Sequence, residues 1–121
     1  MSAASDALRA VLQATFPTGW VIQFGRWRDD PADQSKRYLV VRPVGGYGAE
    51  VVRRPLFNLA IITNATDSSV IADIAAGSII EALRVWPGSE TVMQLQAGEP
   101  VFMATDDGRV VFEMSVTTIT D

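Results

Sequence analysis

The chain has 121 residues, of which 48% are hydrophobic and 20% charged, which suits one globular domain with a real core. It contains no Cys and no His. Disulfides, thiolate zinc sites and thiol catalysis are therefore excluded, and the commonest general base is absent. These absences argue against an enzyme, although carboxylate, Lys or Arg chemistry remains formally open.

No secretory signal is expected, because residues 1–19 lack a basic start followed by an apolar run. No apolar stretch approaches the ~20 residues needed to cross a bilayer, so we expect a protein without membrane contact.

Charge is spread unevenly along the chain. Residues 26–54 hold seven Lys/Arg against four Asp/Glu, a net of +3, and the remainder holds three against ten, a net of −7, which sum to −4. Surfaces of opposite sign suit head-to-tail contacts between identical subunits. Chance clustering of surface charge is the alternative that the sequence leaves open.

An amphipathic helix is predicted over residues 4–16, where Leu8, Leu12 and Phe16 recur on one face and Pro17 ends the pattern. Three strands should follow, broken by polar or glycine-rich turns. The predicted strands are 20–27, 38–43 and 56–64, with a polar loop at 28–35 and a flexible turn at 45–48. The third is apolar on both faces except at Asn58, which indicates a central strand or one covered by a partner.

A second helix is predicted over residues 68–86, capped by Thr66 or Asp67 and ended by Pro87. Its interior Gly77 costs ~1 kcal/mol relative to Ala, so close packing against the sheet or against another subunit is expected there.

Three further strands complete the pattern: 90–97, 101–104 and 110–120. The last two should form a hairpin around Asp106-Asp107-Gly108, a strong turn signal. In the final strand, Glu113, Ser115 and Thr117 alternate with apolar residues, so one face is buried while the other is wet or meets another protein. The order α-β-β-β-α-β-β-β predicts a single α+β domain over 1–121, with a mostly antiparallel, mixed sheet and both helices on one face.

Candidate chemical sites are weak. The acidic groups Asp29-Asp30-Asp33 and Asp106-Asp107 match no calcium-loop pattern, and no metal site is predicted. Arginines at 37, 42, 53 and 54 could form a basic patch, but a pI near 4.7 argues against nucleic-acid binding. No catalytic or cofactor-binding residue is assigned.

Several segments together resemble a known family. They are RRPLFNLAIIT at 53–63, ADIAAGSIIEALR at 72–84, and DDGRVVFEMSVTTIT at 106–120. With the opening helix, they are similar to the tail terminator proteins of long-tailed, non-contractile phages, and the similarity covers nearly the whole chain.

The resemblance implies a structural virion protein without cofactor or reaction. Identical subunits would form a ring, a hexamer in that family, which caps the tail tube, ends its polymerisation and presents the head-joining surface. The implied partners are other copies of the chain, the tail tube protein and a head-completion or neck protein, with DNA passing through the lumen unbound. The resemblance implies a protein of the virion, at the head-proximal end of the tail, that is assembled in the cytoplasm of the bacterial host.

Six residues are predicted to contact a neighbouring subunit or the tube: Arg37, Arg53, Arg54, Glu113, Ser115 and Thr117. Two alternatives stay open: a head-completion or neck connector protein of the same kind of phage, and a small-ligand-binding α+β module with a pocket near Trp20 or Trp27.

Overall fold

The computed structural model describes residues 3–28, 30, 32–33, 35–47, 54–64, 66–88, 92–98, 100–104 and 109–120. Its elements are α1 (Ala3–Thr15), β1 (Val21–Phe24), β2 (Tyr38–Tyr47), β3 (Arg54–Ile62), α2 (Ser69–Val85), β4 (Val92–Ala97), β5 (Val101–Ala104) and β6 (Val110–Thr120). The expected element order and the α+β class are confirmed.

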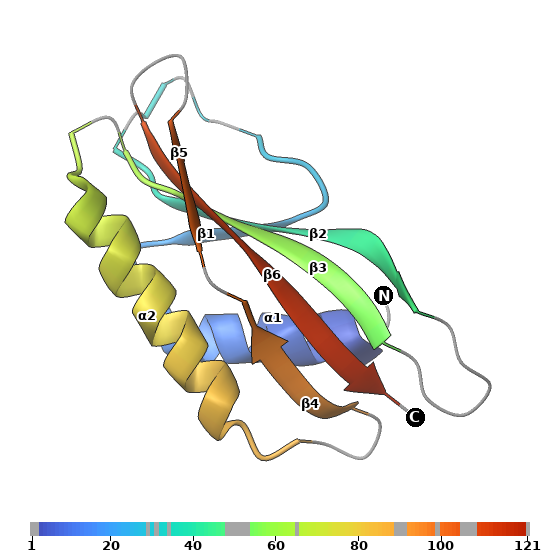
Figure 1. Cartoon of the computed structure of the whole chain (residues 1–121). Coiled ribbons are helices and arrows are strands. Elements are labelled where there is room, and N and C mark those ends of the chain that lie inside the picture. The colour runs from blue at the N-terminus through green and yellow to red at the C-terminus, as the bar shows by residue number, and fades with distance from the viewer. Residues whose placement is uncertain are drawn as a thin grey trace.

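The strands form one six-stranded mixed sheet in the order β1-β2-β3-β6-β4, with β5 also paired to β6. All neighbouring pairs are antiparallel except β1 and β2. Strands β4 and β5 lie end to end along the edge of β6 that β3 leaves open (Figure 1). The third strand of the chain is thus central, as its two-sided apolar pattern predicted.

The main core lies between the sheet and the two helices. Leu8 and Leu12 of α1 pack in one cluster with Ile79 of α2 and with Leu59 and Met114 of the sheet, and all five are buried. In Figure 1, α2 runs beside β4 while α1 crosses behind the strands. Each helix buries the apolar stripe that its 3.6-residue period predicted.

A second, smaller core covers part of the opposite sheet face. Tyr38, Ile62 and Val111 pack there with Val40 and the half-buried Trp27. Trp27 belongs to the connection between β1 and β2, residues 25–37. Parallel strands need a long connection that crosses a sheet face, and the helices occupy the other one. The connection therefore covers this end of the second face and leaves the rest of it open.

The predicted ends of the first two strands were wrong, and the third strand, predicted over 56–64, is Arg54–Ile62. Strand β1 ends at Phe24, because Gly25 adopts a φ of 100° that turns the chain, so Trp27 lies outside the sheet. Strand β2 continues to Tyr47, since the ladder with β3 resumes at Gly46 after an irregularity that begins at Pro43. The turn predicted at 45–48 is thus strand up to residue 47, and residue 48 lies outside the described residues.

The cap of α2 also differs from the prediction. The helix begins at Ser69 with Ser68 as its N-cap, and no side chain bonds the cap position. Asp67, predicted as a cap, instead binds Arg37. The predicted hairpin between β5 and β6 is present, although its turn residues, 105–108, lie outside the described residues.

Candidate assembly surface

The sheet face away from the helices carries a polar strip along β6. Glu113, Ser115 and Thr117 alternate with the buried Met114 and Val116, so the three point to the same side. The structure therefore brings together three of the six residues predicted as contacts.

The neighbouring strands extend this strip sideways. Pairing sets Leu56 opposite Thr117, Asn58 opposite Ser115 and Ala60 opposite Glu113. On the far side of β3, Arg42 of β2 is opposite Asn58 and is exposed. We call this region of β2, β3 and β6 the open sheet face.

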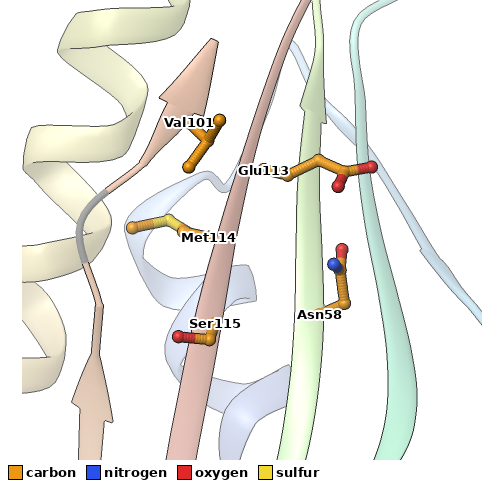
Figure 2. Close-up of a pocket in the computed structure, with 5 residues that line it drawn as sticks. All are labelled: Asn58, Val101, Glu113, Met114 and Ser115. Carbon is orange, nitrogen blue, oxygen red and sulfur yellow. The ribbon is translucent and has the colours of Figure 1, made fainter. Parts of the chain in front are cut away.

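A shallow hollow of about 320 Å³ lies in the open sheet face. Its lining residues are Asn58, Val101, Glu113, Met114 and Ser115. Figure 2 shows Glu113 reaching from β6 across β3, toward the part of that strand that carries Asn58. The Oδ1 atom of Asn58 is buried and accepts no hydrogen bond from the described residues. A buried amide oxygen without a donor is costly, so a hydrogen-bond donor from outside the chain would stabilise this hollow.

Gly98 lies against Ser115, one of the residues that line the hollow. Its backbone N–H donates to the carbonyl oxygen of Ser115 at 2.8 Å. A Cβ atom at Gly98 would come within 2.6 Å of the Ser115 hydroxyl oxygen. The missing side chain therefore leaves room for the Ser115 hydroxyl between the two strands.

Arg37, also predicted as a contact, lies away from the open sheet face. Its Nε and Nη2 donate to the two carboxylate oxygens of Asp67 at 2.7 and 2.8 Å, and its guanidinium lies over the ring of Trp20. These hydrogen bonds hold the pKa of Asp67 below its ordinary value and raise that of Arg37. The pair ties the start of β2 to the turn before α2, so Arg37 has a role within the chain.

The two remaining predicted contacts are Arg53 and Arg54. Arg54 opens β3, at the end nearest Leu56, and its backbone pairs with Tyr47. Arg53 lies outside the described residues.

The described residues offer little support for a catalytic or metal-binding role. No group of three or more Asp or Glu side chains there could hold a metal ion. No helix formed by the described residues is long and apolar enough to span a membrane. What the open sheet face offers is a broad polar surface with one buried acceptor, which suits contact with a protein better than catalysis.

Comparison with known proteins decides the family. The family model described as phage tail termination protein matches residues 1–121, the whole chain. The chain belongs to this family. Membership makes it a structural component of a phage tail, as the resemblance of its segments implied.

A solved structure shares the fold of this tail termination protein. It is a chain from the "Virion of native gene transfer agent (GTA) particle", matched with a TM-score of 0.56 and 17% identity over 97% of this chain and 91% of that chain. No curated protein sequence matches significantly.

Sequence reasoning missed two residues that line the hollow, Val101 and Asn58. Val101 was assigned to a strand without a role, yet it is 62% exposed opposite Glu113. Asn58 was noted only as a break in an apolar pattern. A polar residue on a two-sided apolar strand is the signal that could have indicated the hollow.

Proposed function

We propose that this tail termination protein stops growth of the tail tube by closing a ring of identical subunits on the last tube ring. The ring is a hexamer by the family resemblance, and its other side receives the head-completion or neck protein. The observation that carries the proposal is the family match over the whole chain.

The charge pattern supports contacts between unlike surfaces of identical subunits. A ring needs one patch that fits a different patch on the next subunit. The part of the chain around β1 and β2 exposes basic side chains, namely Arg26, Arg28 and Arg42. Helix α2 exposes the acidic side chains of Asp73 and Glu81. Opposite charges on separate faces favour head-to-tail approach over face-to-face approach.

The acidic balance of the chain also fits a conduit for DNA. The chain has a net charge of −4, so few Lys or Arg side chains would contact the phosphates of a passing duplex and release its counterions. DNA would therefore cross the lumen without binding. Neutralising the lumen-facing acids should then make DNA adhere, and unchanged DNA passage in such variants would remove this part of the proposal.

The test is a tube-capping experiment with the tail tube protein of the same particle. Tubes are polymerised with and without this protein, and their lengths and ends are measured by electron microscopy. Tubes of limited length with a ring of extra density at one end are expected. Tubes of unlimited length with bare ends would overturn the proposal.

The same experiment separates the terminator from a neck connector. A connector would leave tubes bare and would bind the portal-side assembly instead. Mixing this protein with purified portal or neck protein and measuring the mass of the complex by light scattering identifies that outcome.

A further inference from the structure

The outward face of α2 carries an apolar stripe that nothing in the described structure covers. Val70, Ile74 and Val85 are 58%, 62% and 60% exposed. At 3.6 residues per turn, they fall within about 60° of one another around the helix and span roughly 22 Å of its length. Single exposed apolar residues are ordinary, but three in line on one helix indicate a contact surface.

Gly77 lies at the middle of this stripe. It is exposed, and a Cβ atom there would meet nothing within 4 Å. Packing against the sheet, the more ordinary explanation of this glycine, is therefore wrong. A helix-interior glycine costs ~1 kcal/mol relative to Ala, and no contact among the described residues offsets that cost. Close approach by a backbone from outside the chain would do so.

The two ends of the stripe match each other about its centre. Val70 stands seven residues before Gly77 and Val85 stands eight residues after it. In an antiparallel pair of α2 helices crossing at Gly77, the valine at one end of each helix therefore meets the valine at the other end of its partner. Ile74, three residues before Gly77, would lie beside the partner's Glu81, whose aliphatic carbons can contact it while the carboxylate keeps its own bond to Arg84.

Charge supports the same arrangement. Asp73 and Arg84 lie on the same flank of the stripe, about 20° apart around the helix axis, and both are exposed. Across a two-fold axis, that flank of one helix faces the same flank of the other. Each Asp73 then approaches the partner's Arg84, which also bonds Glu81 of its own helix at 2.6 Å. The pairing therefore places opposite charges together on one flank.

The other flank of the stripe is mostly apolar. A hollow of about 200 Å³ borders it, and its lining residues are Phe16, Trp20, Arg37, Ile71, Ile74, Ala75 and Ser78. Its one charged group, the Arg37 guanidinium, is paired with Asp67. A two-fold pair would bring this apolar flank against its own copy, which removes apolar surface from water on both sides.

We propose that α2 packs antiparallel against α2 of a second copy of this chain, crossing at Gly77. This contact goes beyond the proposed function, because an isologous contact closes after two copies and cannot propagate round a ring. One helix pair buries less than the ~1,600 Å² of a standard interface, so the dimer dissociates on dilution. It holds free subunits in pairs that separate before a ring closes on a tube.

The first test is the mass of the full chain by sedimentation equilibrium over a dilution series. The wild type should change from dimer to monomer as it is diluted. Gly77→Leu should raise the dissociation constant at least tenfold while raising the unfolding midpoint of the monomer, because Leu is a better helix former than Gly. Ala10→Glu is the control, since Ala10 is exposed on α1, outside both α2 and the open sheet face, and it should leave the dissociation constant within twofold.

Charge reversal tests the geometry. Asp73→Arg should weaken the dimer at least fivefold by facing the partner's Arg84, and the double variant Asp73→Arg/Arg84→Asp should restore it to within threefold.

Because the chain has no Cys, a single Gly77→Cys substitution reports the two-fold axis directly. Oxidation should give covalent dimers and nothing larger, whereas Ala10→Cys, on exposed α1, should give no covalent dimer. A wild type that is monomeric throughout, a mass that Gly77→Leu leaves unchanged, or no covalent dimer from Gly77→Cys overturns the proposal. Tube capping is read separately: Gly77→Leu should still cap tubes, and failure of the wild type to cap would overturn the ring alone.

Discussion

Asp67 shows how one side chain can join three segments of the chain. Its carboxylate accepts two hydrogen bonds from Arg37 and one from the backbone N–H of Asn64 at 3.1 Å. Asn64 in turn donates from its side chain to the carbonyl of Ser35. The connection before β2 is thus fastened to the turn before α2. Since the Asp67 side chain is only 8% exposed, solvent screens this ion pair less than a surface one.

Replacing Asp67 with Asn should lower the free energy of unfolding by about 2 kcal/mol, because hydrogen bonds to a charged group contribute roughly 1.5–3 kcal/mol. The pKa of Asp67 is lowered chiefly by Arg37. A lowered pKa in the folded state contributes stability above the unfolded value, and that stability is lost as pH falls through the folded value. Denaturant unfolding at pH 7 and near pH 3 measures both effects, and the wild-type advantage should shrink at the lower pH.

Glu81→Gln provides the control, since its ion pair with Arg84 lies on the exposed surface of α2. That change should leave stability at pH 7 unaltered. Equal losses of unfolding free energy from both substitutions would show that the burial of Asp67 does not make its ion pair more stabilising than the exposed one.

The sequence could not show this pair. Arg37 and Asp67 are 30 residues apart, and only the fold brings them together. From local pattern alone, Arg37 resembled a free cation for a subunit contact and Asp67 resembled a helix cap. Both side chains were noticed because their residue types carry chemistry, but the role of each is set by the other.

At the scale of elements, the connection between β1 and β2 defines how much of the sheet stays open. Gln23 holds its first turn: the side-chain amide donates to the carbonyl oxygen of Arg28, and the amide oxygen accepts from the backbone N–H of Arg28, both at 2.9 Å. Farther on, the Tyr38 hydroxyl accepts from the backbone N–H of Asp30 at 2.9 Å. These bonds order the connection without any partner.

Gln23→Ala should therefore loosen the connection without unfolding the protein. The backbone N–H of Arg28 should exchange with solvent at least tenfold faster, which corresponds to about 1.4 kcal/mol of lost protection. Hydrogen exchange followed by NMR measures this, with the global unfolding midpoint nearly unchanged. Gln96→Ala, an exposed glutamine on β4, is the control and should alter neither quantity. Unchanged exchange at Arg28 would mean that the Gln23 hydrogen bonds do not hold this turn.

Periodicity predicted the elements better than their ends. Helix α2 and strand β6 were found with the correct buried faces, because long amphipathic patterns average over many residues. The end of β1 was wrong because alternation continues through Trp27, although Gly25 turns the chain out of the sheet. The parallel pairing of β1 with β2 could not be read from the pattern, since register between strands is a property of the whole sheet.

On the scale of the whole molecule, two faces remain for contacts with other chains, and they differ in chemistry. The outer face of α2 carries exposed Val and Ile side chains together with Asp73, Glu81 and Arg84, which suits a copy of itself. The open sheet face is polar, with Arg42, Glu113, Ser115 and the buried oxygen of Asn58. A protein that meets both its own copies and a tube needs at least two distinct surfaces. Of these, the sequence predicted only the β6 strip in advance.

Glu113→Lys tests whether the open sheet face takes part in assembly. The substitution reverses a charge on a half-buried side chain of the polar strip and adds no bulk to the helix-side core. Surface substitutions away from the core shift stability by only ~0.5 kcal/mol, so the unfolding midpoint should hardly change. Tube capping should weaken at least tenfold, because like charges meeting across an interface are repelled.

Two control variants separate charge from folding in this test. Glu113→Gln keeps the shape and removes the charge, so it should weaken capping less than the lysine variant. Asp6→Lys makes the same charge reversal on exposed α1, away from the open sheet face, and should cap tubes like the wild type. Tube length distributions by electron microscopy give the readout for all three. If Glu113→Lys limits tube length as well as the wild type does, the open sheet face is not the tube or ring contact, and the edge formed by β4 and β5 becomes the surface to test next.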